Sequence, residues 1–154
     1  MIKKPVYIHY GDGQFRTPNP IRNINYFTKP HGGLWASRKD DELGWKDWCE
    51  REEFRLDSFD QSFEFTLRDS ARVLALDNLD QLDNLPTIND EQFPYNKGNT
   101  FSSCYLDFEK IKQEYDAIEL VDIWKFYWAL YGWDCNSILI MNPDIVEVIR
   151  EGDT

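Results

Sequence analysis

The segment KPHGGLWAS, residues 29–37, constrains the fold more than any other part of the chain. A basic residue and a proline precede two glycines, which run directly into Leu34, Trp35 and Ala36. Glycine lets a backbone turn sharply or be approached closely, because it has no Cβ. The pattern therefore has two interpretations. It is either a tight turn into a core strand, or a backbone that a ligand approaches, with an aromatic face and the Ser37 hydroxyl beside it.

Short strands are predicted on both sides of this turn. Alternating polarity, or β-branched and aromatic content, predicts strands at residues 6–10, 34–36, 62–67, 72–76, 117–121 and 137–141. Helical spacing predicts helices at residues 43–53, 77–85 and 107–115, and a short C-terminal helix after Asn142-Pro143-Asp144. Residues 14–31 and 87–103 are predicted loops, and no conformation is assigned to 124–131.

These elements predict an α+β fold with a mixed or antiparallel sheet. Strands outnumber helices, and no strict βαβ alternation appears. A chain of 154 residues is long enough for one domain with a core and too short for two ordinary ones. We therefore expect a single domain spanning residues 1–154.

Composition restricts the class of protein. Hydrophobic residues make up 42% of the chain and aromatic residues 16%, which favours an aromatic core and excludes a disordered chain. No run approaches the roughly 18 apolar residues of a membrane span, and no signal-like stretch follows Met1, so we expect a cytoplasmic protein without membrane contact. Cys49, Cys104 and Cys135 are widely spaced and form no Cys/His cluster, which predicts buried thiols and neither disulfides nor a metal site.

The charge is unevenly distributed along the sequence. The formal net charge of −11 disfavours nonspecific nucleic-acid binding, which requires basic residues to displace counterions. Residues 1–39 carry a balance of +6 and the remainder −17. The N-terminal quarter is therefore the predicted place for an anionic ligand, and the acidic remainder is typical of a solvated surface.

Several short pieces, taken in order, resemble the ADP-ribosyltransferase superfamily, in particular its diphtheria-toxin-like and poly(ADP-ribose) polymerase-like branch with a His-Tyr-Glu triad. The first piece is Ile8-His9-Tyr10-Gly11, and the second is residues 31–37. Trp48-Cys49 resembles the end of the next helix, and Glu119 resembles the late-strand glutamate. Two departures are Tyr10, inserted between the histidine and the glycine, and Trp35, which replaces the first tyrosine. Either departure fits a divergent active member or an inactive relative.

The resemblance implies a split β-sheet, NAD as substrate, and transfer of ADP-ribose to a macromolecular acceptor or to water. A protein acceptor fits the acidic chain better than a nucleic acid. Glu119 would stabilise the oxocarbenium-like transition state, as carboxylates do in glycoside hydrolysis. The resemblance implies that His9 forms a hydrogen bond with a ribose hydroxyl of NAD and that the dinucleotide approaches the backbone at Gly11 and Gly33. Trp35 and Trp48 would form two opposite aromatic walls, and Ser37 would contact the nicotinamide amide. Arg16 and Arg22 would contact the pyrophosphate.

Each of these residues also has an ordinary structural interpretation. Glu119 would also fit an edge strand that faces water, and His9 would fit a position in a sheet where its hydrogen bonds are satisfied. The tryptophans would also fit core packing, and the arginines would fit ordinary surface charge. An RNA 2′-phosphotransferase would need a cluster of Arg and His, and the chain holds only His9 and His31. The alternative from a different class is a catalytically inactive acidic protein-interaction module, such as a toxin-neutralising or phage-encoded partner. No nucleophile elbow, P-loop or dinucleotide fingerprint appears.

Overall fold

The computed structural model describes residues 4–24, 28–41, 43–52, 61–88, 104–130 and 133–153. Its strands are β1 (Tyr7–Tyr10), β2 (Leu34–Arg38), β3 (Gln61–Leu67), β4 (Val73–Leu76), β5 (Ala117–Leu120), β6 (Ser137–Ile140) and β7 (Val146–Asp153). Its α-helices are α1 (Trp45–Glu52), α2 (Phe108–Ile111) and α3 (Ile123–Phe126). Two 3₁₀-helices are η2 (Leu79–Asn84) and η4 (Pro143–Ile145).

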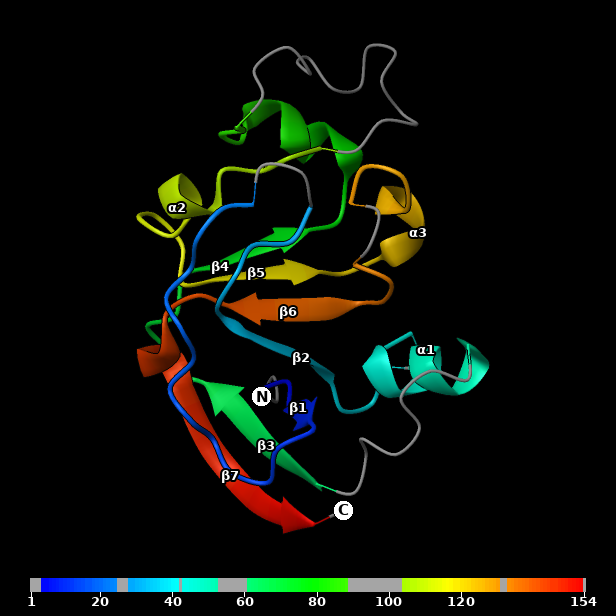
Figure 1. The fold of residues 1–154 in the computed structure, drawn as a ribbon, viewed down its shortest axis with the longest axis vertical. Helices are drawn as coiled ribbons and strands as arrows, with labels where there is room; N and C mark the ends of the chain where they lie inside the picture. Colours follow the sequence, from blue (N-terminus) through cyan, green and yellow to red (C-terminus); the bar gives the residue numbers. More distant parts are fainter. Residues whose placement is uncertain are drawn as a thin grey trace.

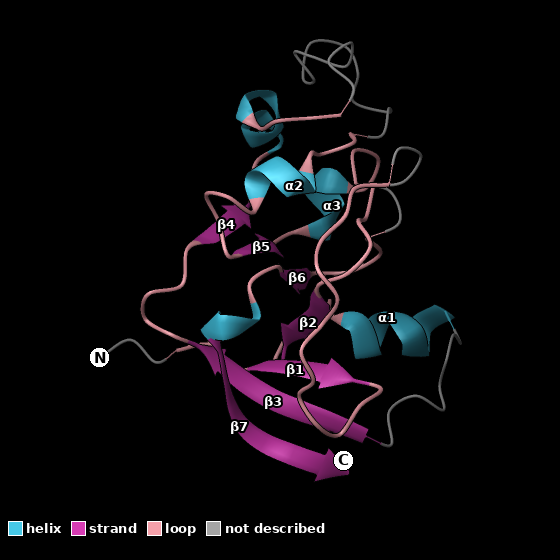
Figure 2. Cartoon of the chain, turned by 60° about the vertical axis from the view of Figure 1, so that its left-hand side comes forward, coloured by secondary structure: helices cyan, strands magenta, loops and turns pink. Residues whose placement is uncertain are grey.

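The strands form one curled, mixed sheet in the order β4-β5-β6-β2-β1-β3-β7 (Figure 1). β4 and β5 are parallel, and the other neighbouring strands are antiparallel. β2 is the middle strand and connects the two halves of the sheet, because it pairs with β6 on one side and with β1 on the other. Figure 2 shows β1, β3 and β7 at one end of the molecule and α2 and α3 beside the other. The α+β class with a mixed sheet is confirmed.

Two core clusters lie on opposite faces of the strands. Across neighbouring strands, Trp35 is paired with Leu139, which in turn is paired with Ile118. All three belong to the cluster that packs under α2, α3 and η2. The intervening Ala36 and Ile138 belong to the second cluster, with Tyr7, Phe63 and Phe65. Successive side chains of a strand point to opposite faces, so this register determines on which side each candidate residue lies.

The predicted C-terminal helix is wrong. A 3₁₀ turn of three residues, Pro143–Ile145, follows Asn142, and the chain then continues as β7 beside β3. Asn142 caps that turn, because its side chain accepts a hydrogen bond from the backbone N–H of Asp144. The sequence Asn-Pro-Asp therefore predicted the start of a helical turn correctly, but it did not determine the length of that turn. Val146 and Val148, separated by Glu147, carry the period-two pattern of the strand.

Other predicted elements are confirmed with changed details. Asp107 caps α2 through the N–H of Lys110, although the helix is only four residues long. The leucines at spacing three form η2, which suits the three residues per turn of a 3₁₀-helix. The unassigned aromatic segment begins as α3. All three cysteines are buried and free. Among the helices that the structure describes, none has the length and apolar character needed to cross a membrane.

Candidate functional site

A cavity of about 270 Å³ lies where β1, β2, α1 and the chain before β6 meet. Its wall is mainly aromatic, with polar groups from β1 and β2. We call it the tryptophan cavity and define it by the lining residues His9, Lys29, Trp35, Ser37, Trp45 and Trp133. Trp35 and Trp133 meet edge to face, with ring centroids 4.8 Å apart.

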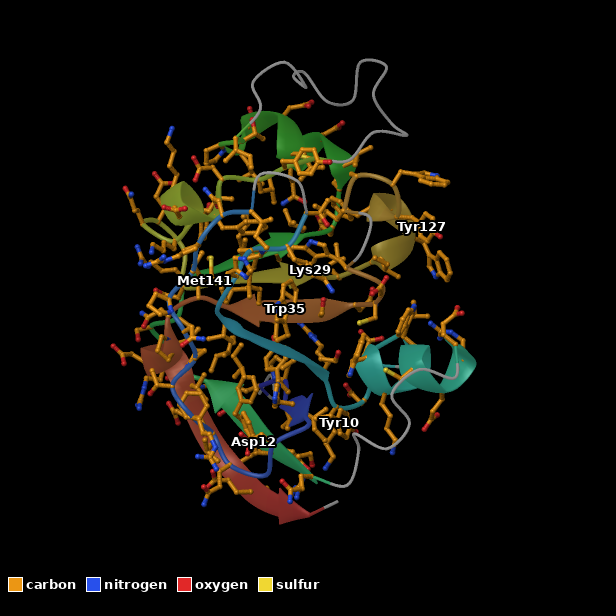
Figure 3. The ribbon with its side chains drawn as sticks, in the orientation of Figure 1. Tyr10, Asp12, Lys29, Trp35, Tyr127 and Met141 are labelled. Atoms are coloured by element: carbon orange, nitrogen blue, oxygen red, sulfur yellow. The ribbon has the colours of Figure 1, made fainter. Side chains whose placement is uncertain are left out.

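One cation lies against this aromatic wall. The Lys29 ammonium is 5.3 Å from the centroid of the Trp35 ring, a cation–π distance, and Figure 3 shows the two side chains close together. Burial lowers the pKa of Lys29, while the Asp134 carboxylate opposes that change. The indole N–H of Trp133 donates to the Thr28 carbonyl at 3.0 Å, which fixes that ring. The cavity thus offers planar apolar walls and a partly desolvated ammonium group.

His9 contributes a neutral imidazole. Its Nδ1 lies 2.6 Å from the Trp35 carbonyl oxygen, and because a carbonyl only accepts, Nδ1 carries the proton. Burial lowers the pKa of His9, whereas the bond to the Trp35 carbonyl and the charge of Asp12 oppose that shift. This tautomer leaves Nε2 as the acceptor atom of the ring.

The Ser37 hydroxyl has a structural task that the sequence did not suggest. It donates to the Asn136 carbonyl at 3.1 Å and accepts the backbone N–H of Trp45 at 3.0 Å. Ser37 therefore ties the first residue of α1 to β2 and positions the Trp45 ring at the cavity.

The two glycines before β2 serve a tight chain crossing. A Cβ at Gly33 would lie 2.7 Å from a methyl carbon of Leu139 and 2.9 Å from one of Ile21. Its N–H donates to the Asn19 carbonyl at 2.9 Å, and its φ of +76° lies in the left-handed region. Gly33 does not line the tryptophan cavity. The structure therefore supports the turn interpretation of KPHGGLWAS at the glycines, and Trp35, Lys29 and Ser37 of the segment line the cavity.

The structure places Glu119 away from this cavity. Glu119 is paired with Ile138 across β5 and β6, and Ile138 with Ala36, so its side chain lies on the face opposite Trp35. Arg38 holds the carboxylate through Nε at 2.7 Å and Nη2 at 3.1 Å, and the Tyr7 hydroxyl donates to it at 3.0 Å. Burial and this carboxylate raise the pKa of Tyr7, and the hydrogen bond to Glu119 raises the pKa of Arg38.

Glu119 lines a second cavity, of about 140 Å³, with Arg38 and Asn136. Ser137, at the start of β6, lines both this cavity and the tryptophan cavity. The predicted carboxylate and the aromatic wall therefore lie on opposite faces of the sheet, in cavities that share Ser137, and they do not form one cleft.

The remaining predicted contacts lie elsewhere. Arg16 forms an exposed ion pair with Asp12 at 3.0 Å. Gly11 adopts a φ of +107°, nothing lies within 4 Å of the position that a Cβ would take there, and its N–H donates to the Gln61 carbonyl. Trp48 stacks on Trp45 with centroids 5.2 Å apart and lines a third cavity beyond it. Of the predicted site residues, His9, Trp35 and Ser37 come together.

Sequence reasoning missed Lys29, Trp45 and Trp133 as cavity residues. Trp45 shares a helix face with Trp48, and the spacing alone could not tell which ring would reach β2. Trp133 follows a segment with no assigned conformation. Arg22 forms a backbone bridge with His31 beside the glycine turn, a contact that concerns its main chain only.

Half of the six described basic residues in the N-terminal quarter form ion pairs with the acidic remainder. Lys4 pairs with Asp69 at 2.6 Å, Lys39 with Glu64 at 3.0 Å, and Arg38 with Glu119. These contacts engage part of the basic region in which an anionic ligand is predicted, and that prediction stays a prediction. Lys29 is the member of that region that faces the tryptophan cavity.

Comparisons of the chain with models of known families, with curated proteins and with solved structures give no match. In the part of the chain that the structure describes, no group of three or more His, Cys, Asp or Glu side chains is arranged to hold a metal ion.

Proposed function

We propose that the tryptophan cavity binds the nicotinamide ring of NAD, and that the chain acts in the ADP-ribosyl transfer which its sequence resemblance implies. The observation that supports this proposal is the aromatic wall of Trp35, Trp45 and Trp133, with the neutral ring of His9 beside it. Aromatic faces attract a cationic ring such as the pyridinium of NAD. Planar heteroaromatic rings bind to such walls by stacking and edge contacts. The proposal includes a cytoplasmic location, where NAD is present.

The size of the cavity restricts which part of NAD enters it. About 270 Å³ is just below the range of roughly 300 to 1,000 Å³ that holds a drug-sized ligand, so it accommodates a ring and part of a sugar. The pyrophosphate would lie outside the aromatic walls. Lys29 supplies a positive charge at the cavity for that part of the ligand, since an anion stabilises a partly desolvated ammonium group.

The transfer step needs a carboxylate near the ribose. Glu119 is the proposed group, and its cavity adjoins the tryptophan cavity at Ser137. In the structure both of its oxygens accept hydrogen bonds from Arg38, and its side chain lies on the face of the sheet opposite Trp35. Action on a ribose therefore requires the release of that guanidinium and a movement of the carboxylate toward the tryptophan cavity. The same ion pair favours a second candidate function, the inactive protein-interaction module, because it neutralises the proposed catalytic charge.

Calorimetric titration of NAD into the full chain tests ring binding. We expect Trp45→Ala to weaken NAD binding by roughly tenfold, whereas Trp128→Ala, an exposed control, leaves it unchanged. Trp45 belongs to neither core cluster, so circular dichroism should show both variants folded. No NAD binding by the wild type, or equal effects of both variants, would reject the proposal.

Nicotinamide release tests the catalytic half separately. Release by the wild type that Glu119→Gln abolishes, with NAD binding retained, would support ADP-ribosyl chemistry. Binding without release would favour the inactive module. Release that persists in the folded Glu119→Gln variant would remove Glu119 from the mechanism while leaving the cavity as the NAD site.

A further inference from the structure

A separate cavity of about 540 Å³ lies between α1 and α3. Three aromatic side chains line it, Trp48 from α1 and Trp124 and Tyr127 from α3 and the turn after it. Trp124 is 65% exposed and Tyr127 43%, which is a large apolar exposure for such side chains. Figure 1 shows both helices on the same side of the molecule, and Figure 3 shows Tyr127 on that side.

The helix geometry directs these rings toward one another. Trp124 and Tyr127 are three residues apart, so they share one face of a helical turn. The Asp122 side chain caps α3 by accepting the N–H of Trp124 at 3.1 Å, which fixes the start of that turn. Trp48 is held from the other side by its stack on Trp45, with an interplanar angle of 12°. Aromatic side chains from two elements thus line one cavity.

Two carboxylates face the same hollow. Asp134 has a φ of +68°, a left-handed conformation that Asp tolerates better than most residues. Because of this turn, Asp134 lines the α1–α3 cavity while its neighbours Trp133 and Cys135 line the tryptophan cavity. Glu52, at the end of α1, is the second carboxylate.

The environment of these carboxylates favours a positive ligand. Burial raises the pKa of Asp134, Lys29 lowers it, and the nearby Glu52 raises it again. In the described part of the chain, no ion pair within 4.0 Å forms at either Asp134 or Glu52. Arg51 also lines the cavity, so its charged side chains sum to −1.

We propose that this cavity, defined by Trp48, Trp124, Tyr127, Glu52 and Asp134 and here called the ammonium cage, binds a trimethylammonium group. Aromatic faces attract such cations through their quadrupole, and a quaternary ammonium group requires no hydrogen-bond acceptor. The carboxylates add long-range attraction without direct coordination. A free choline-like molecule and a trimethylated lysine side chain present this same group.

Titration with choline chloride, followed by calorimetry, tests the cage against its neutral isostere 3,3-dimethylbutan-1-ol. We expect choline to bind at least about tenfold more tightly than the alcohol, because only the cation gains the interaction with the rings and carboxylates. Equal binding of the two, or no choline binding, would overturn the proposal.

Matched variants locate the site. Trp124→Ala should weaken choline binding by roughly tenfold, whereas Ile149→Ala, an exposed apolar side chain on β7 that does not line the cavity, should leave it unchanged. Glu52→Gln should weaken binding and Arg51→Gln should tighten it, each about threefold. Trp124 is mostly exposed, so its loss should not unfold the chain. Tighter binding in Glu52→Gln, or equal effects at Trp124 and Ile149, would overturn the assignment.

The source of the ammonium group is resolved by a second titration. N-acetyl-trimethyllysine amide is compared with choline and with unmethylated N-acetyl-lysine amide. Tighter binding of trimethyllysine than of choline indicates a modified protein as the source, and the reverse indicates a small molecule. Tighter binding of unmethylated lysine than of both other ligands would overturn the proposal. Such a site would recognise a primary ammonium group through hydrogen bonds, and not a trimethylammonium group through aromatic faces.

Discussion

Single residues in this protein show how neighbours decide the role of a charged group. The Glu119 side chain is 8% exposed, and Arg38 and Tyr7 satisfy its two oxygens. A buried carboxylate without such partners would be unfavourable by several kcal/mol, so the three side chains act as one unit. This unit joins β1, β2 and β5 across the sheet, from positions as far as 112 residues apart.

Removing the guanidinium should therefore be costly. We expect Arg38→Met to lower the free energy of unfolding by about 2 kcal/mol, since it leaves Glu119 with Tyr7 alone, and urea denaturation measures this loss. The double variant with Glu119→Gln should recover part of it. Arg16→Met is the matched control, because the Arg16–Asp12 pair is exposed, and it should cost under about 0.5 kcal/mol. Similar losses for Arg38 and Arg16 would contradict the buried-pair argument.

His9 gives stability a dependence on pH. Burial lowers its pKa in the folded state below the value of about 6.5 that it has when unfolded. The unfolded chain therefore binds the proton first as the pH falls. The contribution of His9 is complete above about pH 6.5 and declines between that value and the lower folded-state pKa.

Replacing His9 by Gln keeps a donor near the Trp35 carbonyl and removes the titration. The urea concentration at the midpoint of unfolding should be lower at pH 5.5 than at pH 7.5. This decrease should be larger for the wild type than for His9→Gln. Carboxylates titrate in both proteins, so the difference between the two slopes isolates the histidine. Equal slopes would show that the imidazole keeps its ordinary pKa in the folded chain.

At the scale of elements, the turn before β2 determines where that strand lies. Gly32 packs beneath the Pro20 carbonyl, with a φ of +79°. Arg22 and His31 exchange two backbone hydrogen bonds beside it, at 3.0 and 2.8 Å. These hydrogen bonds connect the predicted loop of residues 14–31 to the turn. The turn fixes the start of β2 and so the position of Trp35 at the cavity.

This packing predicts different costs for two left-handed glycines. Gly32→Ala should destabilise the chain by about 3 kcal/mol or more, because the new Cβ collides with rigid backbone as well as straining φ. Gly11→Ala adds only the conformational cost of about 1 kcal/mol, since nothing lies within 4 Å. Thermal unfolding of the two variants measures the difference, and equal losses would argue against the close crossing.

Local patterns in the sequence predicted most elements, while partners across the sheet had to come from the structure. The alternation in residues 62–67 and the Asp107 cap depend on nearby residues, and both predictions are confirmed. The face on which Glu119 lies depends on the pairing of β5 with β6 and of β6 with β2. No local pattern contains that register, so Trp35 was predicted at the site, whereas Trp45, Trp133 and the position of the carboxylate were not.

For the whole molecule, the sheet is built from strands distant in sequence. β2 pairs with β6, and β3 pairs with β7 along the full length of β3. Such contacts require the closure of long loops before they contribute stability. We expect refolding in milliseconds to seconds, measured by stopped-flow tryptophan fluorescence after dilution from urea. Complete refolding in microseconds would contradict a fold that depends on these pairings.

The ion pairs between the N-terminal quarter and the rest of the chain have a consequence for the denatured state. Lys4, Arg38 and Lys39 contact acids far along the sequence, and the charge blocks they belong to persist when the structure is lost. At low ionic strength the positive block is attracted to the negative remainder, which contracts the unfolded ensemble. Salt screens this attraction as well as the repulsion within the negative remainder. Added sodium chloride should therefore let the N-terminal quarter of the unfolded chain move away from the remainder, so that β1 and β2 search a larger volume before they find their partners.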